Sequence, residues 1–186
     1  MPVPVEVFLS NRDLWAPVAC LLAILAGLSF PLSARTAALF RADRLTTLGS
    51  LLCLAVVAAF TLPTRLSSHG PVSCTVAGLP ETVSVTDPQN FLNVLLYVPP
   101  AFLGVLVTRR LSWVVAGLAA TSVSIEFAQL LSDRRDCNTA DMIFNILGAV
   151  AGAGAAVVLL RRRSVRGGKR PVPDGSRPDQ TPNGAG

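Results

Sequence analysis

Five long apolar runs dominate the pattern of hydrophobic and polar positions along this chain. They cover residues 14–34, 45–62, 91–107, 113–131 and 142–160. Only the fourth contains a charged residue, Glu126. A run of about 20 apolar residues matches the hydrocarbon thickness of a bilayer, where only helices or closed barrels satisfy the backbone. Barrel strands would alternate polar and apolar residues, and these runs do not. The pattern predicts an all-α, polytopic membrane bundle of five transmembrane helices.

Composition and charge favour a membrane protein over a nucleic-acid-binding one. The 186 residues are 51% hydrophobic and 15% charged, against about 25% charged residues in a typical soluble domain. The net charge is +5, but with five spans 12 of the 16 lysine and arginine residues fall on one side. Because basic loops stay in the cytosol, we expect the N-terminus outside, the C-terminus inside and no nucleic-acid partner.

The segments between and beyond the runs suggest the domain organisation. Residues 1–13 are expected to form a short extracytoplasmic leader, and residues 14–160 the transmembrane domain, with a long outer loop over 63–90. Residues 161–186 are rich in arginine and then in proline, glycine and other polar residues. We therefore predict a disordered, basic cytoplasmic tail there.

Polar residues gather near one end of three predicted helices. Glu126 lies five residues before Leu131, so it is about 7 Å inside the outer boundary of its span. A carboxylate costs about 2.5–3.5 kcal/mol at the centre of a membrane helix and less toward the ends. The topology places the same ends of spans three, four and five in the outer leaflet. The residues expected to converge there are Asn93, Glu126, Gln129, Arg135, Asp141 and Asn145.

Three interpretations of this polar layer remain open. One is a network of ion pairs and amides that locks the helices together. Another is a pocket for a lipid headgroup or an envelope ligand, in which Arg135 would meet an anionic group and the amides would donate hydrogen bonds. Glu126 or Asp141 could instead act as a general acid or base in an enzyme.

Other kinds of chemistry are not indicated. The single histidine, His69, has no cysteine or carboxylate spaced with it as a metal ligand, so we expect no metal site and no cofactor. Ser122 and Ser124 lie near Glu126 without a histidine or lysine base, and we expect both hydroxyls to bond back to their own helix.

Cysteines and glycines add two structural expectations. Cys74 and Cys137 fall in the two extracytoplasmic loops, where an oxidising environment permits a disulfide. The alternative is two unrelated thiols. Gly148 and Gly152 form a small-xxx-small pair in the last span, which is typical of closely packed membrane helices.

The polar segments also resemble the VanZ-like family of bacterial integral membrane proteins. The spacings E-x-x-Q, R-x5-D and D-x3-N-x2-G carry the resemblance over residues 87–155. The matching residues are Asn93, Leu95 to Pro99, Glu126 to Gln129, Arg135, Cys137, Asp141, Ile143 to Asn145 and Gly148. The chain departs from the family pattern at Ala101, where the family usually has glycine, and at Asn138, where an acidic residue often follows the cysteine.

The resemblance implies a role in the bacterial cell envelope, at the cytoplasmic membrane. The family's named member is associated with low-level resistance to the glycopeptide teicoplanin. By resemblance, this protein would contribute to such resistance or bind a lipid-linked or glycopeptide ligand, with membrane lipids as its other partners and the six polar residues above as site candidates. A non-enzymatic role is our leading hypothesis. The alternatives are a membrane-embedded enzyme acting on a lipid carrier and a scaffold without a ligand.

Overall fold

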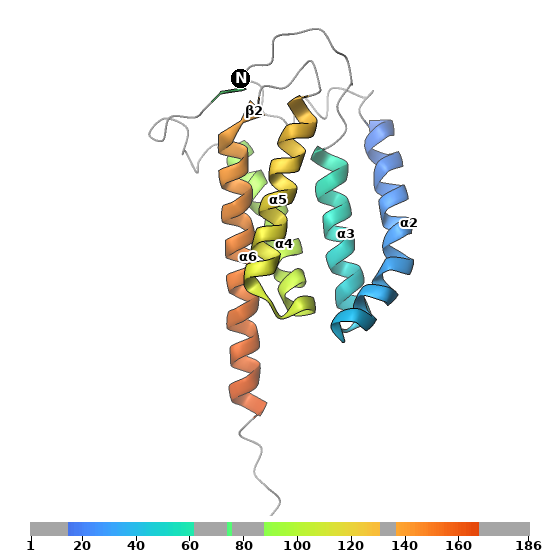
Figure 1. Ribbon diagram of the computed structural model, residues 1–186, viewed down its shortest axis with the longest axis vertical. Coiled ribbons are helices and arrows are strands. Elements are labelled where there is room, and N and C mark those ends of the chain that lie inside the picture. The colour runs from blue at the N-terminus through green and yellow to red at the C-terminus, as the bar shows by residue number, and fades with distance from the viewer. Residues whose placement is uncertain (1–14, 62–73, 76–87, 131–136, 168–186) are drawn as a thin grey trace, which may run out of the picture.

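The structure is a computed structural model that describes residues 15–61, 74–75, 88–130 and 137–167. In this part of the chain, five helices stand side by side in one bundle (Figure 1). They are α2 (Trp15–Phe40), α3 (Arg44–Thr61), α4 (Pro88–Thr108), α5 (Leu111–Leu130) and α6 (Thr139–Gly167). All five are long and apolar enough to cross a membrane. The prediction of an all-helical bundle with five membrane-spanning helices is therefore confirmed.

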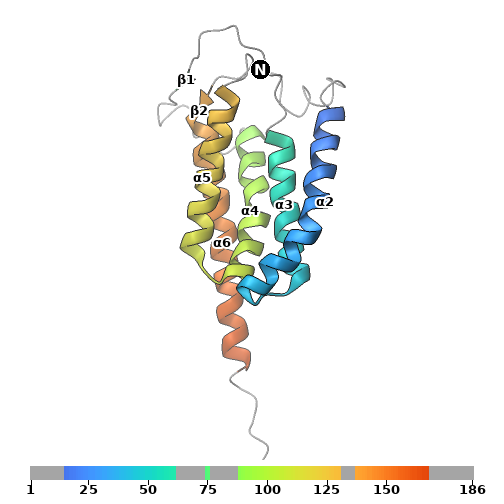
Figure 2. The same cartoon turned by 45° about the vertical axis from the view of Figure 1, so that its right-hand side comes forward.

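The helices alternate in direction, so the described bundle has two distinct ends. Helices α2, α4 and α6 run one way, and α3 and α5 return (Figures 1 and 2). At one end, the short strands β1 (Cys74–Thr75) and β2 (Cys137–Asn138) pair in parallel; we call this the strand end. At the other, Arg41, Arg109 and Arg110 lie in the turns from α2 to α3 and from α4 to α5, and Arg44 begins α3; we call this the arginine end.

Two helices continue beyond the limits predicted from hydropathy. Helix α2 extends to Phe40 rather than ending near residue 34, and α6 extends to Gly167 rather than to residue 160. Residues 161–167 are thus helical, and the prediction of disorder was wrong for them. Arginine is a good helix former and is favoured near a helix C-terminus, so a helix need not stop where its apolar run stops. The leader, most of the outer loop and the rest of the tail lie outside the described residues.

The core of the bundle lies between α4, α5 and α6, and α3 joins it by packing against α4. Helices α4 and α6 make the most extensive contact. Ala149, Ala153 and Ala156 of α6 are completely buried. A Cβ atom added to Gly148 or Gly152 would overlap the carbonyl oxygen of Val94 or Val98. Small residues on α6 therefore let the two backbones touch.

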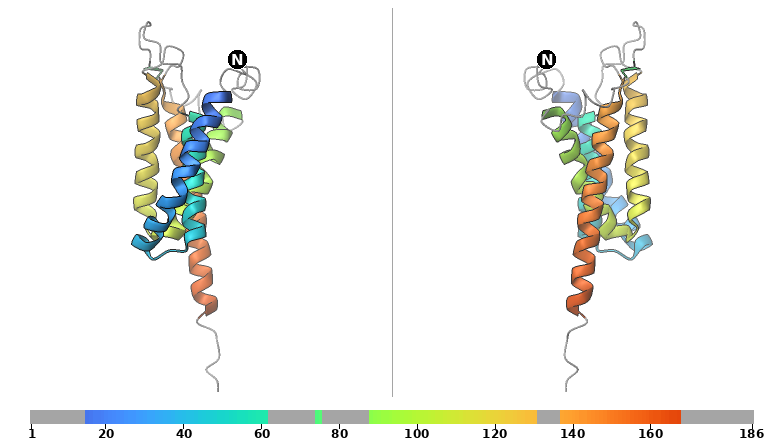
Figure 3. Two further views of the ribbon diagram at one scale, coloured as in Figure 1. Left: turned by 90° about the vertical axis from the view of Figure 1, so that its right-hand side faces the viewer. Right: turned by 90° about the vertical axis from the view of Figure 1, so that its left-hand side faces the viewer.

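Helix α2 is bent in its second half, and its last turns lie close to the start of α3 at the arginine end (Figures 1 and 3). Pro31 lies inside the helix. A proline there removes a backbone hydrogen bond and kinks the helix. The bend carries Phe40 toward α4 and α5, where it lines a pocket with residues of both helices.

Candidate functional site

The first part of the site is a carboxylate held by amide groups at the strand end. Asp141 lies in the first turn of α6, where the positive end of the helix dipole favours a negative charge. Its Oδ1 accepts a hydrogen bond of 2.8 Å from Nδ2 of Asn93 on α4. Nε2 of Gln89, one turn earlier on α4, lies 3.4 Å from both carboxylate oxygens. Asp141 therefore ties α6 to α4 through charge-assisted hydrogen bonds.

The second part lies one turn deeper and joins α6 to α5. Nδ2 of Asn145 donates a hydrogen bond of 2.9 Å to Oγ of Ser122. Both side chains are buried. The Ser122 hydroxyl therefore takes part in a contact between two helices, which was not expected from the sequence. Ser124 does bond back, to the Ala120 carbonyl at 2.8 Å, as expected for a hydroxyl on the outer face of a membrane helix.

Glu126 and Tyr97 complete this buried layer. Glu126 is 5% exposed and Tyr97 is 0% exposed. The side chains of Ser122 and Glu126 both lie within interaction distance of the Tyr97 hydroxyl. Burial of a carboxylate, a phenol and an amide together in an apolar bundle is costly unless each finds a hydrogen-bond partner.

Two oxygen atoms in this layer have hydrogen-bonding capacity left over. Within the described residues, neither the Tyr97 hydroxyl oxygen nor Oδ1 of Asn145 makes a hydrogen bond of standard geometry. Buried side-chain polar atoms are satisfied in the large majority of cases. Both atoms therefore keep the capacity to accept a hydrogen bond.

The polar cluster, as we call it, consists of three pairs, each spaced four residues apart on one helix. The pairs are Asn93 and Tyr97 on α4, Ser122 and Glu126 on α5, and Asp141 and Asn145 on α6. Residues at this spacing share a helix face. Tyr97 and Ser122 of the cluster, and Gln89 as a partner of Asp141, were not among the predicted site residues, although the four-residue spacing was visible on each helix.

The remaining predicted site residues are placed as follows. The structure brings Asn93, Glu126, Asp141 and Asn145 to the same region of α4, α5 and α6. Gln129 belongs to α5, but its side chain lies outside the described part of the structure, as does the whole of Arg135. The role of Arg135 in binding an anion stays a prediction.

The predicted disulfide partners lie opposite one another in the backbone. Cys74 of β1 pairs with Cys137 of β2 in the parallel ladder. Neighbouring strands are about 4.7–4.9 Å apart, within the Cα separation of about 4.4–6.8 Å that a disulfide needs. The backbone placement is compatible with the bridge, which stays a prediction.

No set of three histidine, cysteine or acidic residues that could hold a metal ion occurs within the described residues.

A search among curated proteins gave no match. A search among solved structures gave no match either. A family model described as VanZ/LLP1 matches residues 18–161, which include all six residues of the polar cluster. The chain therefore belongs to the VanZ/LLP1 family, as a protein with several membrane-spanning helices.

Proposed function

We propose that this protein binds the hydroxyl-bearing headgroup of a lipid-linked saccharide at the polar cluster, in the outer leaflet of a bacterial cytoplasmic membrane. The role is one of recognition and not of catalysis. Through that binding the protein would contribute to tolerance of teicoplanin-type glycopeptides, the trait associated with the family's named member.

The observation that carries this proposal is the pair of buried oxygens with hydrogen-bonding capacity to spare, those of Tyr97 and Asn145. The amide oxygen of Asn145 can only accept a hydrogen bond. A matching ligand must therefore supply donors. Sugar hydroxyls and amide N–H groups do so without bringing in a charge, and a lipid anchor would hold them at membrane depth.

The expected orientation supports an outer-leaflet ligand. The described basic residues of the helix connections lie at the arginine end, and Arg161–Arg163 continue α6 on that side. Positively charged loops remain in the cytosol. The strand end, which holds the polar cluster, would then face the exterior, where lipid-linked saccharides are displayed.

Substitution of Tyr97 by phenylalanine separates ligand recognition from a purely structural lock. If the cluster only locks the bundle, removal of a hydroxyl that makes no hydrogen bond of standard geometry within the described residues should leave stability and bound lipids unchanged. If the hydroxyl meets a ligand, Tyr97→Phe should lower ligand retention several-fold while thermal stability stays the same. Ser124→Ala is the matched control, because its hydroxyl bonds to Ala120 of its own helix and is exposed.

The measurement is native mass spectrometry of the protein released from bacterial membranes, followed by titration with teicoplanin as a defined probe. We expect a co-purifying saccharide-bearing lipid in the wild type and in Ser124→Ala, with much less in Tyr97→Phe. Equal occupancy in all three proteins, or no bound saccharide in any of them, would overturn the proposal.

A further inference from the structure

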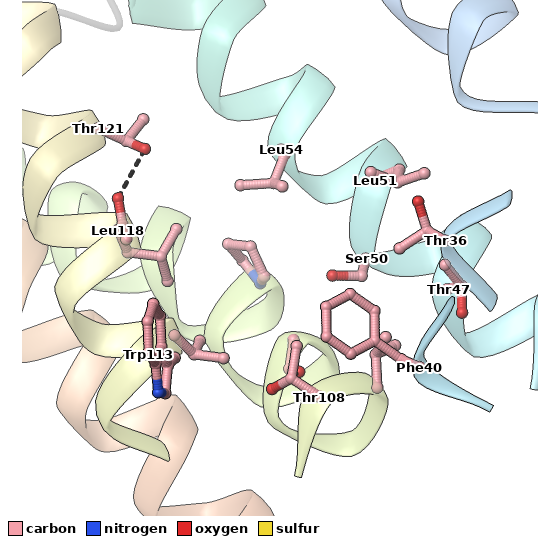
Figure 4. Close-up of a pocket in the computed structure, with 15 residues that line it drawn as sticks. Thr36, Phe40, Thr47, Ser50, Leu51, Leu54, Thr108, Trp113, Leu118 and Thr121 are labelled. Carbon is pink, nitrogen blue, oxygen red and sulfur yellow. Dashed lines mark hydrogen bonds between the residues drawn. The ribbon is translucent and has the colours of Figure 1, made fainter. Parts of the chain in front are cut away.

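A second feature, lined by none of the residues of the polar cluster, is an apolar groove that extends from the arginine end (Figure 4). Its volume is about 340 Å³. Trp113 and Leu118 of α5 lie on one side, Leu51 of α3 and Phe40 of α2 lie on the other, and α4 contributes residues from Pro100 to Thr108. That stretch of α4 is about 12 Å long at 1.5 Å per residue. The groove is thus long enough for part of one extended hydrocarbon chain.

Hydroxyl groups along the groove do not make it polar. Thr47 donates to the carbonyl of Asp43 at 2.9 Å, Thr108 to that of Gly104 at 2.9 Å, and Thr121 to that of Gly117 at 2.8 Å. Hydroxyls bonded back to their own backbone offer little to a ligand. The surface that remains is overwhelmingly apolar.

The mouth of the groove is positively charged. Arg41 follows Phe40 directly, and Arg109 and Arg110 follow Thr108, so the basic turns begin where the groove lining ends. All three arginines, and Arg44 beside them, are exposed. The acidic side chain in these turns, Asp43, accepts hydrogen bonds from Thr46 at the start of α3. The charge at the mouth therefore favours an anion.

We infer that this groove binds one acyl chain of an anionic phospholipid from the leaflet at the arginine end, with the headgroup phosphate against the arginines of the two turns. An apolar channel and a cationic mouth match the two halves of such a lipid. Arginine suits the phosphate because its planar donors pair with two phosphate oxygens at once. This inference does not depend on the polar cluster, so Tyr97→Phe should leave it unchanged.

Tryptophan fluorescence gives a direct test, because Trp113 lines the groove and is one of two tryptophans in the chain. The full-length Trp15→Phe variant keeps Trp113 as its single fluorophore. We would reconstitute it in phosphatidylcholine vesicles containing increasing amounts of brominated phosphatidylglycerol, which quenches tryptophan on contact. Quenching should saturate at a low fraction of the anionic lipid, and brominated phosphatidylcholine should be several-fold less effective. Quenching that follows mole fraction equally for both lipids would overturn the inference.

Two matched pairs of variants assign the two halves of the lipid. Gly117 lines the groove and Gly154 lies on α6 outside it, and an added Cβ would meet nothing within 4 Å at either position. Gly117→Leu should abolish the preference for phosphatidylglycerol, whereas Gly154→Leu should preserve it. Retention of the preference in Gly117→Leu would show that the chain does not occupy the groove.

The second pair tests the headgroup. The double variant Arg44→Gln/Arg110→Gln should lower the preference for phosphatidylglycerol several-fold. Arg161→Gln/Arg162→Gln removes the same charge from exposed positions of α6 and should have little effect. An equal loss in both double variants would indicate general surface attraction and would overturn the assignment of the phosphate to the mouth of the groove.

Discussion

At the scale of single residues, the contact between Asp141 and Asn93 is the best-defined interaction of the polar cluster. A hydrogen bond of 2.8 Å between an amide and a carboxylate links the start of α6 to α4. Hydrogen bonds to charged groups contribute about 1.5–3 kcal/mol to stability. The sequence showed that both residues would lie near the outer ends of their helices, but a sequence does not state which side chains meet.

A double variant that exchanges Asn93 and Asp141 should regain stability that either single substitution removes. Asn93→Asp places two carboxylates together, and Asp141→Asn replaces the charged acceptor by a weaker neutral one, so each should destabilise the protein by about 1–3 kcal/mol. The double variant Asn93→Asp/Asp141→Asn recreates one donor and one acceptor. We expect it to recover at least half of the loss in a thermal denaturation assay in detergent, analysed as a double-mutant cycle. Simple additivity of the two losses would show that the side chains do not interact.

Asp43 provides a prediction about pH, because it caps α3 outside the membrane-spanning segments. Hydrogen bonds from the backbone N–H and hydroxyl of Thr46, and from the N–H of Leu45, lower the pKa of this carboxyl below its usual value. A lowered folded-state pKa stabilises the protein above the unfolded-state pKa of about 4, and the contribution is lost as pH falls through the folded value.

The stability difference between wild type and Asp43→Ala should therefore be full near neutral pH and shrink as the pH falls below 4. Asp43→Asn can still cap the helix but does not titrate, so it should stay close to the wild type at neutral pH. Melting temperatures measured from pH 7 to pH 3 test this. A difference between wild type and Asp43→Ala that stays constant over that range would contradict the assigned cap.

At the scale of helices, the sequence identified the five spans because each apolar run is long and nearly free of charge. It missed the helix ends because they depend on propensity and capping beyond the apolar run. Arg41 and Arg109, with φ angles of 51° and 58°, take the left-handed conformation that terminates a helix, although glycine is the usual residue there. The pairing of β1 with β2 was also missed, because it joins short segments of two different connections.

The contact between α4 and α6 depends on the absence of a side chain at two positions. Gly148→Ala and Gly152→Ala should each destabilise the protein by about 1–3 kcal/mol or more, the usual cost of overpacking. The reason is that the new methyl group would overlap the backbone of α4. Gly154→Ala, on the same helix with open space around it, should be neutral or slightly stabilising, since alanine has the higher helix propensity.

Thermal unfolding in detergent micelles would compare the three alanine variants. Unaltered stability in Gly148→Ala and Gly152→Ala would mean that the helices are not as close as the structure places them.

At the scale of the whole molecule, the distribution of arginines predicts the orientation in the membrane. Reporter fusions at the C-terminus should show it: green fluorescent protein should fluoresce there because it folds in the cytosol, and alkaline phosphatase should be inactive. The reverse result would place the polar cluster at the cytosolic face and remove the basis of the proposed function. The groove, in contrast, was beyond prediction from sequence, since it depends on how four helices pack and on the bend of α2.

The parallel contact of α4 with α6 also constrains how the protein can move. Gly148 and Gly152 of α6 face the carbonyl groups of Val94 and Val98 on α4, at the same four-residue interval, so the two helices interlock at both positions. A shift of α6 along α4 by less than one helical turn would place the side chain of an alanine or valine where only the hydrogen of a glycine fits. Any sliding of α6 relative to α4 would therefore proceed in steps of about one helical turn, about 5.4 Å, and each step would carry Asp141 wholly away from Asn93.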